Sequence, residues 1–174
     1  MRRVESLAIT VVGHDRPGII ARTAEVLAAY GMNLEDSSMT LLRGHFAMTL
    51  ICAGQTPAAE VEQALDAAID PSLAVTVRRV PDEHSRAPVG STYLVTVHGA
   101  DRLGIVARLA GTIAEAGGNI TDLTTRLTGS LYVLVAEVDL PPAADPVALQ
   151  TALTGAGREL GVDVTLRRVE NDEL

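Results

Sequence analysis

Lysine is absent from this chain of 174 residues, and all 14 of its basic residues are arginine. A Schiff-base lysine and the lysine of a phosphate-binding P-loop are therefore excluded. The single cysteine, Cys52, can form neither an internal disulfide nor a metal cluster, and its apolar neighbours predict a buried thiol. The formal net charge is −8 and neither half is basic, so we expect no direct binding to nucleic acid.

Long apolar runs are missing as well. No segment approaches the roughly eighteen apolar residues needed to cross a bilayer, and the N-terminus lacks an apolar stretch of signal length. We therefore expect a cytoplasmic protein with no membrane partner. His45, His84 and His98 show no metal-ligand spacing with one another or with Cys52, and no carboxylate pair is placed for acid–base work. We assign no catalytic residue, no metal site and no cofactor.

An internal repeat dominates what is present. Residues 15–36 return as residues 101–122 at a constant offset of 86, with 11 of the 22 aligned positions identical. A repeat of this length is a whole small domain rather than a solenoid unit. We predict two copies, at residues 1–81 and 92–174, joined by a polar linker at 82–91 that is rich in helix and strand breakers.

Each copy shows the same order of hydrophobic patterns, βαββαβ. In the first copy the predicted strands are 7–12, 33–42, 45–53 and 73–78, and the helices are 19–30 and a segment that follows Pro57. In the second copy the strands are 93–98, 119–127, 131–139 and 162–169, and the helices are 103–116 and 145–160. This order predicts two α+β, ferredoxin-like domains, each a four-stranded antiparallel sheet with two helices on one face.

The turn before the first helix carries the chemistry. It reads Asp15-Arg16-Pro17-Gly18 in the first copy. A helix start offers free N–H groups and a partial positive charge, which attract an anion such as a carboxylate, and Gly18 lets a ligand approach the backbone. Asp15 either caps the helix or receives an ammonium group. Asn33 opens the next strand with a side chain that both donates and accepts hydrogen bonds. These groups together match a free amino acid.

Residues 12–19, followed by Gly31-Met32-Asn33-Leu34, resemble the signature of the ACT domain. That family comprises small βαββαβ modules that sense amino acids and regulate metabolism. A chain made only of two such domains is similar to the glycine cleavage system transcriptional repressor group, whose members act by binding a partner activator, with glycine as the proposed signal. The resemblance implies a small amino-acid effector such as glycine and a regulatory protein partner. We also expect a homodimer.

In this family the ligand lies where the first loop of one domain meets the second strand of a neighbour. Carried over by position, the resemblance implies the ligand-binding residues Asp15, Arg16, Pro17, Gly18, Asn33 and Leu34 in the first copy, and Asp101, Arg102, Leu103, Gly104, Asn119 and Ile120 in the second. The second copy departs from the family's pattern, because Leu103 replaces the proline and Ala100 aligns with His14.

Simpler interpretations exist for these residues. The Asp-Arg-Pro-Gly turn is also an ordinary helix start, and Asn33 and Asn119 lie beside glycines at turns. Three functions stay open: an amino-acid sensor, a ligand-free interaction or dimerisation module with the same fold, and an enzyme. The enzyme is disfavoured because no nucleophile–base set or phosphate loop is present. We favour a non-enzymatic sensor that controls transcription of glycine cleavage metabolism through a protein partner.

Overall fold

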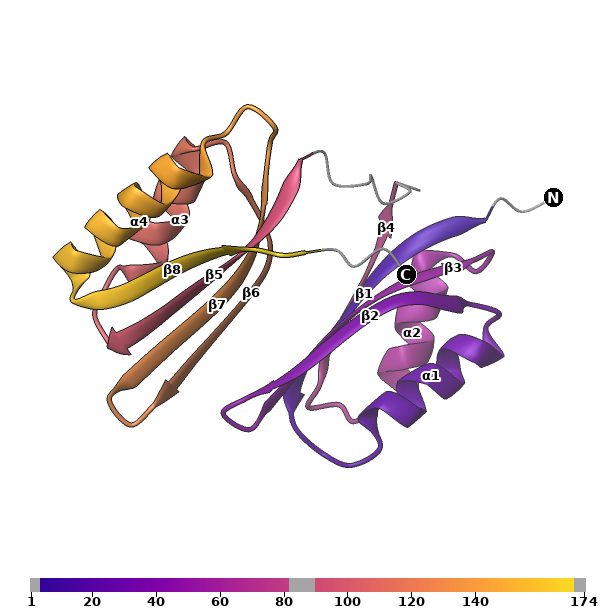
Figure 1. Ribbon diagram of the computed structural model, residues 1–174. Coiled ribbons are helices and arrows are strands. Elements are labelled where there is room, and N and C mark those ends of the chain that lie inside the picture. Colours follow the sequence, from indigo (N-terminus) through magenta and orange to yellow (C-terminus); the bar gives the residue numbers. More distant parts are fainter. Residues whose placement is uncertain (1–3, 82–89, 171–174) are drawn as a thin grey trace. The chain divides into compact units, whose positions relative to one another are not determined.

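The computed structural model describes residues 4–81 and 90–170, and the chain forms two compact units, one for each copy (Figure 1). The first unit contains β1 (Glu5–His14), α1 (Ile19–Ala29), β2 (Asn33–Leu42), β3 (His45–Gly54), α2 (Ala58–Ala68) and β4 (Ala74–Val80). The second contains β5 (Ser91–Ala100), α3 (Ile105–Glu115), β6 (Asn119–Thr128), β7 (Leu131–Leu140), α4 (Pro146–Leu160) and β8 (Val162–Arg168). Residues 82–89 of the predicted linker lie outside the described residues, and β5 begins at Ser91.

Both units are four-stranded sheets in which every neighbouring pair of strands is antiparallel. The strand orders are β2-β3-β1-β4 and β6-β7-β5-β8, which leave β2 and β6 at an edge. The two helices of each unit cover one face of its sheet (Figure 1). The predicted pair of ferredoxin-like α+β domains is confirmed.

Alternation of side chains along the central strands explains why the helices cover only one face. In β3, Phe46, Met48, Leu50 and Cys52 are all buried, whereas the residues between them are at least partly exposed. Leu27 of α1 and the buried leucine and valine of α2 pack against this row in one hydrophobic core. A second core is built from the other copy alone. Each copy therefore has the apolar interior that an independently folding domain needs.

Glycines with positive φ follow α1, α3 and α4, and another lies in the β2–β3 turn. Gly31 follows α1 with φ 66°, as expected of a left-handed helix stop. The β2–β3 hairpin turns through Arg43 (φ 48°) and Gly44 (φ 81°), and two successive positive φ angles are typical of a type I′ turn. The one large difference between the copies is α4, whose 15 residues exceed the 11 of α2.

The thiol of Cys52 is fully buried in β3, as predicted. Burial raises its pKa above the ordinary value, and the Glu35 carboxylate adds to the effect. A raised thiol pKa means that the folded state favours the neutral form, so this contribution to stability is complete below the ordinary pKa and is lost as the pH rises through the folded value. We expect Cys52 to react with a disulfide reagent at pH 8 at least 100-fold more slowly in the native protein than in urea. Equal rates would show that the first core opens readily.

Candidate functional site

The turn between β1 and α1, residues 15–18, is called the first loop of the first copy; residues 101–104 form the first loop of the second. The backbone N–H of Asp15 donates to the carbonyl oxygen of Gly44 at 3.1 Å, which ties this loop to the β2–β3 turn. Gly18 carries φ 92° and Gly104 carries φ 90°. A Cβ at either glycine would meet no atom within 4 Å. Glycine is therefore required by the backbone conformation, while the space beside it is open to a ligand.

The starts of α1 and α3 have no side-chain cap. Gly18 and Gly104 occupy the N-cap positions, and no side chain accepts a hydrogen bond from the first N–H groups of either helix. By contrast, the Asp145 carboxylate caps α4 by accepting from the N–H groups of Val147 and Ala148 at 2.9 and 3.2 Å. The capping role considered for Asp15 is thus wrong, because Gly18 separates Asp15 from the helix. The amides that would bind a carboxylate are left without a side-chain partner.

A pocket of about 220 Å³ lies beside the first loop of the first copy. Its walls are the loop, the start of α1 and the turn between α2 and β4. The Arg16 guanidinium forms an ion pair with the Asp70 carboxylate on that turn, and Arg22 Nε donates to the carbonyl oxygen of Ala68 at 3.3 Å. Both arginines therefore line the same pocket. The guanidinium of Arg16, the arginine of the loop, is already ion-paired with Asp70.

Asn33 lies at the opposite end of the sheet from the first loop. It pairs with Ala53 in β3, which pairs with Ser6 near the start of β1, whereas the loop follows the last residue of β1. His14 lies eight positions after Ser6 along β1, roughly 25 Å at about 3.3 Å per residue. The equivalent register puts Asn119 opposite Asp139, at the corresponding end of the second sheet. Neither copy therefore brings its own asparagine to its own first loop.

The residue after each asparagine faces the helices rather than the open side of the sheet. Leu34 pairs with Cys52 and is 41% exposed at the sheet edge. Ile120 pairs with Val138 and is partly buried against the second core. A register shift follows each of them, between Leu34 and Asp36 and between Ile120 and Asp122. Such bulges re-aim side chains at a strand edge.

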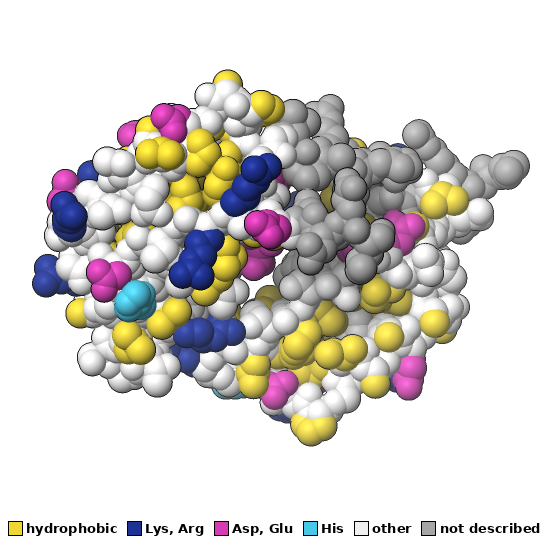
Figure 2. Space-filling model, viewed as in Figure 1, with side chains coloured by type: hydrophobic (Ala, Val, Ile, Leu, Met, Phe, Trp, Pro, Cys, Tyr) yellow, Lys and Arg dark blue, Asp and Glu magenta, His cyan; other side chains and the backbone are white. Residues whose placement is uncertain are grey.

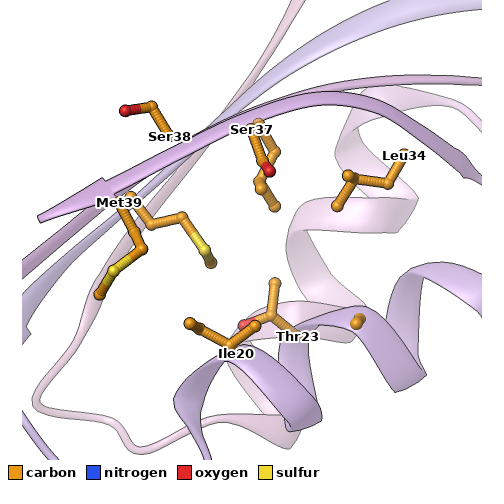
Figure 3. A pocket seen from close by; sticks show the side chains of 9 residues that line it. Ile20, Thr23, Leu34, Ser37, Ser38 and Met39 are labelled. Carbon is orange, nitrogen blue, oxygen red and sulfur yellow. The ribbon is translucent and has the colours of Figure 1, made fainter.

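A second pocket, of about 190 Å³, opens between α1 and β2 (Figure 3). Ile20 and Thr23 point into it from the helix, and Leu34 and Ser37 point into it from the strand, while Ser38 points away (Figure 3). Its lining is largely apolar. Figure 2 shows hydrophobic side chains gathered over β2 and α1 around this opening. The exposed large apolar residues on these two elements are Ile20, Leu34, Met39, Leu41 and Leu42.

The first loop of the second copy is exposed, as that of the first is. Leu103, which replaces Pro17, is fully exposed. Asp101 and Arg102 are also exposed, and Arg108 is ion-paired with Glu159 at 3.2 Å. Arg22 in the first copy is likewise ion-paired, with Glu25 at 3.2 Å.

Two features of the site were missed from the sequence. His14 and His45, at the paired ends of β1 and β3, stack with ring centroids 5.1 Å apart beside the first loop. Asp70 is the other, and hydrogen bonds from Ser72, followed by the Arg16 guanidinium, hold its pKa below the usual value. The pairing of β1 with β3, which is not a hairpin, brings the two histidines together. Within residues 4–81 and 90–170, no three His, Cys, Asp or Glu side chains gather as a metal site would require.

A family model described as ACT domain matches residues 5–77 and 91–167. An uncharacterised protein from Methanopyrus kandleri, named only as a UPF0237 protein, is 44% identical over 75 residues, which are 42% of this chain and 83% of the relative. The glycine cleavage system transcriptional repressor of Escherichia coli is 25% identical over 173 residues, which are 94% of this chain and 90% of that protein.

One relative that aligns over a similar share of this chain is an enzyme. The phosphoserine phosphatase of Streptomyces coelicolor is 31% identical over 169 residues, which are 94% of this chain but only 40% of the phosphatase. Among solved structures, an unknown protein from Galdieria sulphuraria superposes with a TM-score of 0.80 and 30% identity, over 97% of this chain and all of that one. None of the helices in the described residues is long and apolar enough to cross a membrane.

Proposed function

Because the chain belongs to the ACT domain family, we propose that it is a non-enzymatic regulatory protein that binds a small amino acid and reports it to a protein partner. The observation that carries this proposal is the pair of first loops. In both copies a left-handed glycine with open space beside it begins a helix whose first amides no side chain caps. Such a helix start suits the carboxylate of an amino acid.

The remaining groups of the ligand find partners only when a neighbour is present. Asp15 is exposed and does not cap α1, so its carboxylate can receive an ammonium group. Asn33 is distant from the loop of its own copy. Antiparallel pairing of two β2 edges around a twofold axis would place Asn33 of one beside Leu42 of the other, and Leu42 lies next to His45 and the first loop. We therefore place the amino acid at a junction between two ACT domains.

The exposed edge at β2 supports association of chains as homodimers. All of β2 except Thr40 is exposed, and its helix-facing side carries Leu34, Met39 and Leu41. A long unprotected edge strand with apolar side chains favours pairing with another strand. We infer that binding of the amino acid changes how neighbouring domains pair, and that the partner responds to that change. The size of the shift is limited by the ligand's preference for one arrangement over the other.

Glycine is our first candidate effector. We propose that the protein acts in the cytoplasm and that the process it regulates is transcription of the genes of glycine cleavage metabolism. This assignment is supported by the full-length similarity to the Escherichia coli repressor. Glycine has five heavy atoms, so a ceiling of about −1.5 kcal/mol per atom limits its binding free energy to about −7.5 kcal/mol. Micromolar or weaker affinity is therefore expected, which suits the sensing of a metabolite pool.

Isothermal titration of the full chain with each common amino acid tests the sensor. We expect heat from glycine or a similarly small amino acid, and at least a tenfold loss of affinity in Asn33→Ala. Asp66→Asn, on the exposed surface of α2, is the control and should bind as the unmodified chain does. Absence of heat from every amino acid, in protein shown to be folded, would remove the sensing function and leave the fold untouched.

A ligand-free interaction module is the second candidate, and the apolar surface over β2 and α1 favours it (Figure 2). This module would dimerise equally well with and without amino acids. Sedimentation velocity with and without glycine separates the two candidates. The match to a phosphatase does not favour catalysis by this chain, because it spans 40% of that enzyme's length and no metal-binding cluster appears in the described residues.

A further inference from the structure

The two copies use equivalent acidic residues to pair different arginines. Counted back from the last strand of each copy, where the repeat offset is 89, Asp70 corresponds to Glu159. In the first copy, Asp70 pairs with Arg16 of the first loop. In the second copy, Glu159 pairs with Arg108, which corresponds to Arg22 on the first helix rather than to the loop arginine.

The length of the second helix causes this difference. Helix α2 ends at Ala68, so Asp70 lies in the following turn, where Ser72 N–H donates to its Oδ1 at 2.8 Å. Its carboxylate is therefore held on a turn that reaches the first loop. Helix α4 continues to Leu160, so Glu159 stays on the helix and meets the helical Arg108 instead.

Arg102 is left in a different state from Arg16. No carboxylate among residues 4–81 and 90–170 lies within ion-pair distance of Arg102. Its guanidinium instead lies over Gly161, the residue that ends α4: a Cβ added there would lie 3.4 Å from the guanidinium carbon. Gly161 takes the place of Ser72 at the same offset. In the second copy the loop arginine, Arg102, therefore lies beside Gly161. In the first copy the loop arginine, Arg16, lies beside the carboxylate of Asp70.

From this contrast we infer that the two first loops have unequal affinity for a carboxylate: Arg102 binds the carboxylate of the ligand first, and Asp70 acts as an internal carboxylate that occupies Arg16. The inference rests on the proposed function for the identity of the ligand as an amino acid. A ligand reaches Arg16 only by displacing Asp70. Exposed ion pairs are weak, so the handicap of the first copy is a factor of about two to five in half-saturating concentration. Asp70 thus sets the difference in affinity between the two loops. As the ligand concentration rises, the loop of the second copy is occupied first and the loop of the first copy second.

Acetate is the probe, because it carries the carboxylate without the ammonium group. The full chain, labelled with nitrogen-15, is titrated with acetate at constant ionic strength while the Nε–H resonances of Arg16 and Arg102 are followed. We expect the Arg102 resonance to reach half-saturation at a concentration two- to fivefold lower than that of Arg16. Equal concentrations, or the reverse order, overturn the inference.

Two matched variants isolate the ion pair. Asp70→Asn should lower the half-saturating concentration at Arg16 to that at Arg102. Glu159→Gln makes the same change in net charge at the equivalent position of the other copy, but its partner is not a loop arginine. It should leave the response of both loop arginines unchanged. If both variants sharpen the Arg16 response equally, net charge rather than the specific pair is responsible, and the inference fails.

Repeating the titration with glycine and with the other amino acids separates this inference from the sensor. If acetate distinguishes the loops but no amino acid binds, sensing fails and the inequality between the loops stands. If an amino acid binds with Arg16 responding first, sensing stands and the inequality is refuted. If neither acetate nor any amino acid moves either resonance in folded protein, both proposals fall.

Discussion

Truncation of Phe46 to alanine is expected to lower the free energy of unfolding of the first copy by about 3–5 kcal/mol. Phe46 is the only phenylalanine in the chain and is 2% exposed. It lies on the helix-facing row of β3, next to Met48, and the surrounding sheet cannot collapse fully into the space it leaves. A domain of about eighty residues has little more stability than this to lose. The variant should therefore leave the first copy largely unfolded at 25 °C.

Hydrogen exchange read by mass spectrometry checks this result copy by copy. Each core is built from the residues of a single copy, so amides of β1 and β3 should exchange much faster in Phe46→Ala while those of β5 and β7 change little. The internal comparison is Tyr132→Ala at the equivalent position of the second copy, where the side chain is only half-buried and the loss should be smaller. Equal acceleration in both copies would show that the two units unfold as one.

The fold was predictable because the repeat and the hydrophobic periodicities are both strong. The alternation Phe46, Met48, Leu50 and Cys52 fixes which face of β3 is buried, and Gly31 marks the end of the first helix. Once the strand order β2-β3-β1-β4 is known, the separation of Asn33 from its own first loop follows from topology alone. The sequence predicts the start of the first helix less well. Asp15 and Pro17 suggest a helix capped by the aspartate, but the N-cap residue is the left-handed Gly18 and no side chain caps the helix.

The asymmetry between the loop arginines was beyond the reach of the sequence. Asp15, Arg16 and Gly18 are all retained in the second copy, and the departures there, Leu103 and Ala100, do not indicate how either arginine is paired. The difference arises from where a distant helix ends: α4 has 15 residues and α2 has 11, and this additional turn decides whether the acid before the last strand faces the loop or the first helix. Ion pairs between long side chains depend on such tertiary placement and on few local signals, whereas helix and strand formation depends on patterns that extend over many residues.

If chains pair through the β2 edge as proposed, replacement of Met39 by lysine is expected to weaken that pairing by roughly 100-fold, about 2.7 kcal/mol. Met39 is 46% exposed on the apolar side of the β2 edge and lies against the pocket beneath α1 (Figure 3). In a twofold interface each substitution occurs twice, so a solvated charge replaces an apolar side chain at two places in the interface. Charged residues on edge strands are also the usual means by which proteins avoid pairing.

Sedimentation equilibrium measures the change in the dimer dissociation constant. Circular dichroism checks that the substitution at this exposed position has not altered folding. Thr125→Lys is the matched control, because Thr125 holds the equivalent position on β6, opposite Leu134, on an edge that exposes less apolar surface at that point. Dimers that persist in Met39→Lys would mean that chains associate through another surface.

The same variant also reports on the ligand site, since Asn33 and the first loop of one copy lie at opposite ends of a sheet. If monomeric Met39→Lys no longer binds amino acids, the site is assembled from two chains; if binding survives, the ligand does not need the β2 dimer.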